Sequence, residues 1–270
     1  MKIALSLILL ILSSSAFSQQ KTSIDCATYW RKDEVHTYTI FHEKSSPDPN
    51  QAIHFIYEAT VSVLDASDTD YIVKWVYHVP PNVNAGSLSH ADSLPFFEGL
   101  QMIFRISNTG SFLELVNWEE VRDSYRKMMG NSAPKNLFGT KEAVESLLIK
   151  EIQLYHQPYG YKYNTIKDSS ATQLSNPYGG SPLPALQSYQ ITAIDGVQDW
   201  FTLVIRQHLD KASLNKSQQK KQQLASLDLS DYSEYQFIQS TGWIKHLSYK
   251  RKIVSDAYAQ TESFTIDLKD

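Results

Sequence analysis

The chain has 270 residues, of which 42% are hydrophobic and 20% are charged, a balance typical of a globular protein and not of a disordered one. Its net charge of −4 gives no general attraction to nucleic acid or to anionic membranes, so we expect no nucleic-acid partner. Cys26 is the only cysteine, so no internal disulfide can form and stability must come from a hydrophobic core.

The first 18 residues, MKIALSLILLILSSSAFS, have the pattern of a secretory signal peptide. Lys2 precedes an apolar run over residues 3–12, and small residues follow up to an expected cleavage site after Ser18. The run is shorter than the roughly 20 residues that a membrane-spanning helix needs. We therefore expect an exported mature chain without a transmembrane segment, located in the periplasm or outside the cell. Cys26 lies too far beyond the apolar run to carry the lipid of a lipoprotein.

Residues 19–270 are enough for one large all-β or α+β domain, or for two small ones. A long stretch without periodicity over residues 164–186, rich in turn-forming residues, is the one place where two subdomains could divide. The same stretch could instead be a lid over a site.

Period-two alternation predicts two β-hairpins in the first half of the chain. Residues 57–63 and 71–79 form the first, joined by the turn-rich segment 65–70, and a loop follows over residues 82–94. Residues 102–107 and 111–116 form the second, around Thr109 and Gly110. The alternation over residues 36–41 is weaker.

The period then changes to that of a helix. Asn117 and Glu120 resemble a capping box, and Gly130 is expected to end the first helix. A second helix is predicted from Thr140 to Tyr155. The apolar stripe of the first helix consists of Trp118, Val121, Tyr125 and Met128, and that of the second of Val144, Leu147, Leu148, Ile152 and Tyr155.

Strands resume at residues 188–194 and 200–209, and a polar helix over residues 212–227 presents only Leu214, Leu224 and Leu227 as its apolar face. A hairpin over residues 235–247 turns at Thr241 and Gly242, and a strand over residues 263–268 closes the chain. Lys250, Arg251 and Lys252 belong to the one basic concentration in the sequence.

This order predicts an α+β fold: a large, curved, mostly antiparallel sheet or partly open barrel of about nine or ten strands. Two central helices and one peripheral polar helix accompany the sheet. The arrangement resembles the half-barrel of exported lipid and lipoprotein carriers, which also wrap helices inside a strongly bent sheet. The likeness is one of fold alone, because no motif carries it residue by residue.

Motifs for catalysis, metal binding and nucleotide binding are missing from the sequence, so we assign no catalytic residue, metal or cofactor. Two alternatives stay open because only the fold could assemble them. His36 and His42 would share one face of a strand and could ligate a metal with a residue from another strand. Paired carboxylates of a hydrolase could come from distant strands. The acids that cluster at the start of the first helix are Glu114, Glu119, Glu120 and Asp123.

The segment YHQPYGYKY, residues 155–163, carries four tyrosines and a histidine, in a chain with 16 Tyr, 5 Trp and only 10 Gly. Tyrosine has an apolar ring and a polar tip, which suits either a ligand platform or the cover of a core. We take as candidate ligand-binding residues Tyr155, His156, Tyr159, Tyr161, Tyr163 and Tyr178. As a platform, the segment should tolerate replacement of Tyr159 and Tyr161 by alanine with little loss of stability; a core role predicts a large loss.

Three functional classes follow. The favoured one is a non-catalytic exported protein that binds an apolar, amphiphilic or glycan ligand in the cell envelope. The first alternative is a secreted or periplasmic hydrolase whose carboxylates or histidines meet only in the fold. The second is an interaction protein of the envelope that uses a sheet edge or a tyrosine-rich face.

Overall fold

The computed structural model of the chain describes residues 23–45, 52–79, 98–129, 139–214, 224, 226–256 and 258–269. Several sequence predictions lie outside these residues: the signal peptide 1–18, the loop 82–94, the helix stop at Gly130 and the centre of the polar helix at 215–223. The elements in chain order are β1 Ser23–Cys26, β2 Val35–Ser45, β3 Ile53–Ala66, β4 Asp70–His78, β5 Gln101–Ser107, β6 Phe112–Leu115, α2 Trp118–Met129, α3 Lys141–Leu148, α4 Lys150–His156, β7 Tyr161–Asn164, β8 Asp168–Leu174, β9 Leu183–Asp195, β10 Trp200–Leu209, the 3₁₀ turn η5 Lys211–Ser213, β11 Asp228–Ile238, β12 Ile244–Ser255 and β13 Tyr258–Lys269.

One antiparallel sheet of eleven strands makes up most of the described chain, in the order β6-β5-β4-β3-β2-β13-β12-β11-β10-β9-β8. The chain runs outward from β2 to the edge strand β6, crosses through the helices to the other edge at β8, and returns strand by strand to β13. There β13 pairs with β2, so the first and last long strands lie side by side at the centre. The predicted α+β fold with a large, open, antiparallel sheet is confirmed.

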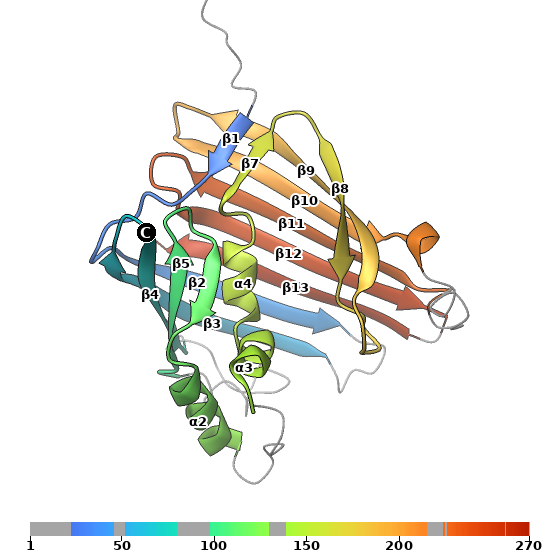
Figure 1. Cartoon of the computed structure of the whole chain (residues 1–270), viewed down its shortest axis with the longest axis horizontal. Helices are drawn as coiled ribbons and strands as arrows, with labels where there is room; N and C mark the ends of the chain where they lie inside the picture. Colours follow the sequence, from blue (N-terminus) through green and yellow to red (C-terminus); the bar gives the residue numbers. More distant parts are fainter. Residues whose placement is uncertain are drawn as a thin grey trace, which may run out of the picture.

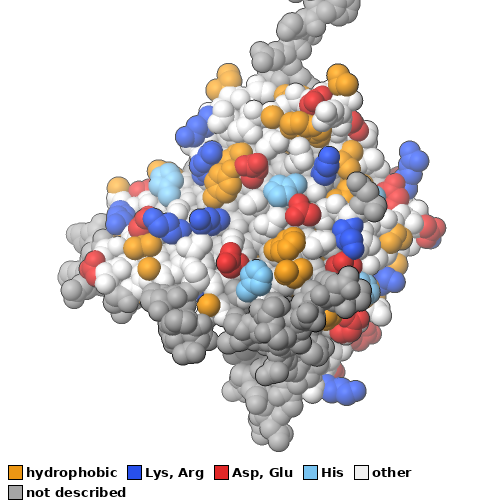
Figure 2. Space-filling model, turned by 180° about the vertical axis from the view of Figure 1, so that it is seen from behind, with side chains coloured by type: hydrophobic (Ala, Val, Ile, Leu, Met, Phe, Trp, Pro, Cys, Tyr) orange, Lys and Arg blue, Asp and Glu red, His pale blue; other side chains and the backbone are white. Residues whose placement is uncertain are grey.

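The sheet is bent around its helices (Figure 1). Strand β5, next to the edge strand β6, and the opposite edge strand β8 stand at a steep angle to the central strands, and α3 and α4 lie across the face between them. We call the face that α4 covers the inner face. The opposite face carries charged side chains of both signs and histidines scattered among uncharged ones (Figure 2). The inner face is therefore where the fold encloses space.

The core lies between α4 and the inner faces of β2 to β5 and β10 to β13. Every second residue of these strands points inward, so the residues of β4 are alternately half-buried and buried. Fully buried side chains of this core include Tyr38, Ile40, Trp75, Phe104, Tyr155, Tyr235 and Ile266. A second apolar cluster lies toward the other end of the sheet and includes Leu174, Leu183, Leu209, Leu229 and Ile253.

Three sequence predictions need correction or completion. The second helix is divided at Ile149, whose backbone leaves the helical region at φ −116° and ψ 25°. Ile149 is fully buried at this break, as are Val144 in α3 and Ile152 in α4. The stretch 164–186 is not irregular: it contains β8 and the start of β9, which pair from Asp168 to Leu174.

The number of strands is also larger than expected, because the polar strand β8 and the short pair β1 and β7 add to the predicted set. β1 and β7 form a separate two-stranded sheet in which Cys26 faces Tyr161. The helix predicted over residues 212–227 does not reach its expected ends, because residues 211–213 form the 3₁₀ turn η5 and residues 226 and 227 are not helical. Its expected apolar residues Leu214, Leu224 and Leu227 are all buried in the second cluster.

Candidate functional site

The three candidate residues at the end of α4 are buried in the core. Tyr155 and Tyr159 are 0% exposed and His156 is 2% exposed. The Tyr155 hydroxyl lies 2.8 Å from that of Tyr38. Tyr159 meets Phe237 edge to face with ring centroids 5.5 Å apart. These contacts give the side chains the surroundings of core residues.

His156 and Tyr159 also tie together the two hairpin turns that share the Thr-Gly sequence. His156 Nδ1 donates to the carbonyl oxygen of Gly110 over 2.8 Å, and the Tyr159 hydroxyl donates to that of Gly242 over 2.6 Å. Both glycines have positive φ, +94° and +74°. A Cβ at Gly242 would lie 2.1 Å from the carbonyl oxygen of Ala27, so glycine is required there for close approach as well as for conformation. The end of α4 thereby holds β5–β6 against β11–β12.

The histidine of this junction is neutral. Burial lowers the pKa of His156 to about 4, and its hydrogen bond to Gly110 only partly offsets that effect. Because a carbonyl oxygen can only accept, Nδ1 carries the proton, and Nε2 is buried against the aromatic core without a hydrogen-bond partner in the described part of the chain. Its neighbours include Phe104 and Trp30, with ring centroids 5.3 and 5.9 Å away. His156 therefore serves as a buried, neutral core residue that donates one hydrogen bond through Nδ1.

The remaining three candidates differ in exposure: Tyr163 is buried, and Tyr161 and Tyr178 are exposed. Tyr161 on β7 is 63% exposed, Tyr163 is 4% exposed, and their ring centroids lie 6.3 Å apart. Both line a pocket of about 330 Å³ between β7 and the inner faces of β8 to β10. Tyr178 is 40% exposed in the turn between β8 and β9 and does not line this pocket. The structure thus brings Tyr161 and Tyr163 together and leaves Tyr178 apart.

A larger hollow of about 710 Å³ lies between α3–α4 and the inner faces of β8 and β10 to β12. We call it the helix groove. The helices contribute Glu142, Glu145, Lys150, Gln153 and Leu154 to its lining, and the sheet contributes Leu174, Gln207, Asp231, Tyr249 and Arg251. Gln157 and Gln207 line both the groove and the smaller pocket, so the two hollows adjoin.

The floor of the groove holds a buried ion pair. Arg251 binds Asp231 through two hydrogen bonds of 2.8 and 2.7 Å, and the Tyr249 hydroxyl donates to the same carboxylate over 3.2 Å. The side chain of Asp231 is only 9% exposed. Such a pair is stable because every oxygen of the carboxylate has a donor, and removal of either partner would leave a buried charge.

A second charged group lies next to the first. Lys150 donates to Glu262 over 2.6 Å, and His42 Nε2 lies 3.2 Å from the other carboxylate oxygen. Burial alone would raise the pKa of Glu262, but the hydrogen bonds and charges of His42 and Lys150 outweigh it and lower the pKa to about 2. The lysine also lies over the Phe264 ring, 5.2 Å from its centroid. Two cations and two carboxylates are therefore paired at the groove, and Glu142 and Glu145 add further negative charge to its lining.

Sequence reasoning missed the charged residues of the groove, although a signal exists. On β11 the inward positions are Leu229, Asp231, Ser233, Tyr235 and Phe237, and two of these five are polar although all are buried. A polar pair at core positions marks a site or a buried network. Arg251 also points inward to Asp231, so it does not join its neighbours Lys250 and Lys252 in one surface patch.

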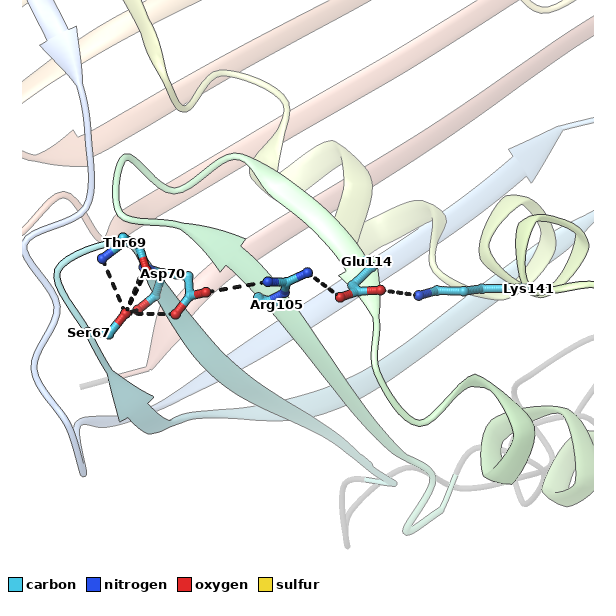
Figure 3. Close-up of polar contacts among 6 residues, drawn as sticks. All are labelled: Ser67, Thr69, Asp70, Arg105, Glu114 and Lys141. Atoms are coloured by element: carbon cyan, nitrogen blue, oxygen red, sulfur yellow. Dashed lines mark hydrogen bonds and ion pairs between the residues drawn. The ribbon is translucent and has the colours of Figure 1, made fainter.

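Of the four acids that were candidates for a hydrolase, Glu114, Glu120 and Asp123 have partners in the structure. Glu114 lies between Arg105 and Lys141, and Arg105 reaches on to Asp70, a chain that joins the β3–β4 turn to α3 (Figure 3). Hydrogen bonds from Lys141 and Arg105 lower the pKa of Glu114. Glu120 accepts a hydrogen bond from Asn117 at the start of α2.

The two histidines that could share a metal lie on the inner side of β2 in different surroundings. His36 packs on Trp243 with ring centroids 4.4 Å apart, and His42 stacks on Phe264 at 3.9 Å. Within the described residues, no group of three or more His, Cys, Asp or Glu side chains is placed to hold a metal ion. Likewise, none of the described helices is long and apolar enough to span a membrane.

Comparison with known proteins gives a fold but no family. No family model matches the sequence, and no curated protein does. A lipovitellin structure concerned with lipid–protein interactions matches over 89% of this chain, with a TM-score of 0.50 and 12% identity. The chain spans only 25% of the length of that lipovitellin chain, and the likeness shows a shared fold alone.

Two bacterial structures also match over 91% of this chain and 100% of their own, both at 8% identity. One is a protein from Bacteroides fragilis that is described as exported and as having a YmcC-like fold, with a TM-score of 0.29. The other is a protein from Parabacteroides distasonis described as a lipoprotein, with a TM-score of 0.27.

Proposed function

We propose that this protein is an exported, non-catalytic binding protein of the cell envelope that holds a small amphiphilic ligand in the helix groove. The observation that carries the proposal is the groove itself, a hollow of about 710 Å³ on the inner face of a bent sheet. Ligand sites in proteins commonly have volumes of about 300–1,000 Å³ and combine apolar walls with a few placed polar groups. The mature chain acts as a single domain, with the β8–β9 hairpin as one wall of the site.

The lining of the groove matches a molecule with an apolar part and a polar part. Leu154 and Leu174 supply apolar surface, and Leu174 continues into the second apolar cluster. The Tyr249 ring adds an aromatic surface, while Arg251 and Asp231 supply charged hydrogen-bonding groups. A hydrocarbon segment would lie along the leucines and its headgroup against the charged pairs.

The charges of the groove indicate a headgroup of little net charge. Arg251 and Lys150 are each already paired with a carboxylate, so an anionic headgroup would have to displace Asp231 or Glu262. Glu142 and Glu145 add further negative charge on the α3 side, which disfavours an anionic headgroup. A zwitterionic or uncharged polar headgroup fits this balance better because it adds no unpaired charge to a partly buried site.

The hydrolase alternative lacks support from the groove. A general acid needs a carboxyl group whose pKa is raised toward neutral pH. Glu262 has a pKa lowered to about 2, and both oxygens of Asp231 are bound by Arg251. The fold shared with lipovitellin, a protein described through its lipid–protein interactions, agrees with binding. The interaction-protein alternative rests on free sheet edges at β6 and β8, which every open sheet has.

The test is native mass spectrometry of the protein purified gently from its exported fraction, before and after denaturation. We expect an extra mass that disappears on unfolding. Gln153→Trp places a large ring at an exposed groove position of α4 and should abolish the extra mass. Val197→Trp is the matched control, because Val197 is 97% exposed in the β9–β10 turn and does not line the groove.

A weakly bound ligand would be lost in purification, so a titration with a zwitterionic fluorescent amphiphile, NBD-labelled lysophosphatidylcholine below its micelle concentration, accompanies the mass measurement. Binding of this amphiphilic probe should be weakened in Gln153→Trp and unchanged in Val197→Trp. A protein that shows neither an extra mass nor binding of the probe, or one whose Gln153→Trp variant keeps both, would refute the proposal.

A further inference from the structure

The smaller hollow, which we call the tyrosine pocket, has a lining unlike that of the helix groove. Aromatic rings and side-chain amides dominate it: the rings are those of Tyr161, Tyr163 and Tyr189, and the amides are those of Gln157, Gln187 and Gln207. Ser170 and Thr172 add hydroxyl groups from β8. All these groups are neutral, and each can exchange hydrogen bonds with a ligand.

The three rings form a floor and a rim. Tyr163 is 4% exposed and meets Tyr189 edge to face, with ring centroids 5.1 Å apart and planes at 79°, so the two rings fix each other. Tyr161 stands beside Tyr163 with its plane turned by 54° and is 63% exposed. An exposed ring beside a rigid, buried one offers a flat apolar face to a ligand at the mouth.

The amides are oriented by partners and keep hydrogen-bonding capacity. Gln207 Nε2 donates to Gln187 Oε1 over 2.6 Å, and Gln157 Oε1 accepts from the Tyr235 hydroxyl over 3.2 Å. Each amide has two N–H donors and a carbonyl oxygen with two lone pairs. These bonds use one donor of Gln207 and one acceptor site each of Gln187 and Gln157. The N–H groups of Gln157 and Gln187 are therefore available to a ligand.

The pocket carries little charge. Lys162 is the one charged residue in its lining, it is 63% exposed, and it lies 3.9 Å from Asp25. A ligand with a full charge would find no buried counter-charge here, in contrast to the ion pairs of the helix groove. Flat aromatic faces combined with neutral donors and acceptors match a ring with apolar C–H faces and hydroxyl groups around its edge.

We infer that the tyrosine pocket binds the ring of a neutral saccharide. The ring stacks on Tyr161 at the mouth, and its hydroxyl groups exchange hydrogen bonds with the three glutamines. A free glycan and the sugar headgroup of a glycolipid share this chemistry. The pocket adjoins the helix groove through Gln157 and Gln207, so a glycolipid could place its sugar in one and its hydrocarbon in the other. The saccharide site does not depend on occupation of the groove.

The test is saturation-transfer NMR of the whole mature protein with maltose, lactose and N,N′-diacetylchitobiose, and with galacturonic acid as the anionic control. We expect transfer to at least one of the neutral sugars. Tyr161→Ala should weaken that binding by about tenfold, because the stacking face is lost. Tyr161→Phe should keep it within about threefold, and Tyr178→Ala is the control for an exposed tyrosine outside the pocket.

A second arm compares the sugar that binds with its dodecyl glycoside below the micelle concentration. Tighter binding of the glycoside, with the gain lost in Gln153→Trp, identifies a glycolipid headgroup; equal binding identifies a free glycan. No transfer to any neutral sugar, transfer to galacturonic acid alone, or binding that Tyr161→Ala leaves unchanged would overturn the inference. Failure of the proposed groove would show differently, as the absence of both an extra mass and binding of the amphiphilic probe, with sugar binding intact.

Discussion

Replacement of Tyr159 by alanine should destabilise the protein strongly. Its ring is 0% exposed among Trp30, Phe237 and Tyr155, and its hydroxyl donates to Gly242 in the core. Truncation of a buried aromatic residue to alanine costs about 3–5 kcal/mol. The unpaired carbonyl oxygen left at Gly242 adds roughly 1 kcal/mol or more. For a chain of this size, each kcal/mol lowers Tm by roughly 2–4 °C, so Tm should fall by about 10 °C or more.

Two further variants separate packing from hydrogen bonding. Tyr159→Phe keeps the ring and loses only the bond to Gly242, so it should cost roughly 1–2 kcal/mol. Tyr161→Ala removes an exposed ring and should cost only about 0.5 kcal/mol. Urea unfolding followed by tryptophan fluorescence gives all three free energies. A loss below about 1 kcal/mol for Tyr159→Ala, or equal losses for Tyr159→Ala and Tyr161→Ala, would refute the assignment of Tyr159 to the core.

Three more outcomes follow from the geometry. Gly242→Ala should cost more than the roughly 1 kcal/mol of a positive φ, because its Cβ would lie 2.1 Å from the carbonyl oxygen of Ala27; urea unfolding measures this cost. Arg251→Met should lower the free energy of unfolding by about 3–5 kcal/mol, because it leaves Asp231 buried and unpaired. The double variant that also carries Asp231→Leu should recover most of that stability. A double-mutant cycle that finds no coupling between the two positions would contradict the prediction. Burial would raise the pKa of Glu262, but its hydrogen bonds lower that pKa to about 2, so the ionised carboxylate stabilises the fold fully above pH 4.5 and loses this effect toward pH 2. The difference in stability between wild type and Glu262→Gln should therefore shrink between pH 4.5 and pH 2 in urea titrations. A difference that stays constant over this range would contradict the prediction.

The sequence predicted the strands with clear alternation and missed those without it. β4 and the hairpin turns at Gly110 and Gly242 were predictable because period two and the positive φ of glycine are local properties. β8, with the sequence DSSATQL, is polar on both faces, because as an edge strand it is largely exposed. β8 is a strand because its backbone pairs with β9, and this pairing leaves no hydrophobic pattern in the sequence of β8.

The break between α3 and α4 at Ile149 was also missed because it depends on tertiary packing and not on local pattern. The apolar spacing of α3 and α4 fits one continuous helix, and only the surface on which the helix packs shows that Ile149 must also be buried. A helix yields to such packing because its intrinsic preference is small compared with the burial of a large apolar side chain.

The aromatic segment 155–163 shows a property that local sequence pattern cannot predict, namely which of its tyrosines are buried. The sequence placed Tyr155, Tyr159 and Tyr161 in one candidate surface, and the fold gives them different surroundings: the first two are fully buried and the third is 63% exposed. Tyrosine is compatible with either environment, since its ring can be buried when its hydroxyl finds a partner. For Tyr159 that partner is Gly242, 83 positions away in sequence.

By itself, the sequence determined the antiparallel α+β architecture, the positions of the glycine turns and the absence of local catalytic motifs, because each depends on neighbours within a few residues. Only the tertiary structure decided which aromatic residues form the core and which polar residues face the groove. Asp231 and Arg251 meet across paired strands, and Lys150 reaches Glu262 over 112 positions. Contacts between residues so far apart depend on strand register and on the docking of α4, which no local pattern encodes.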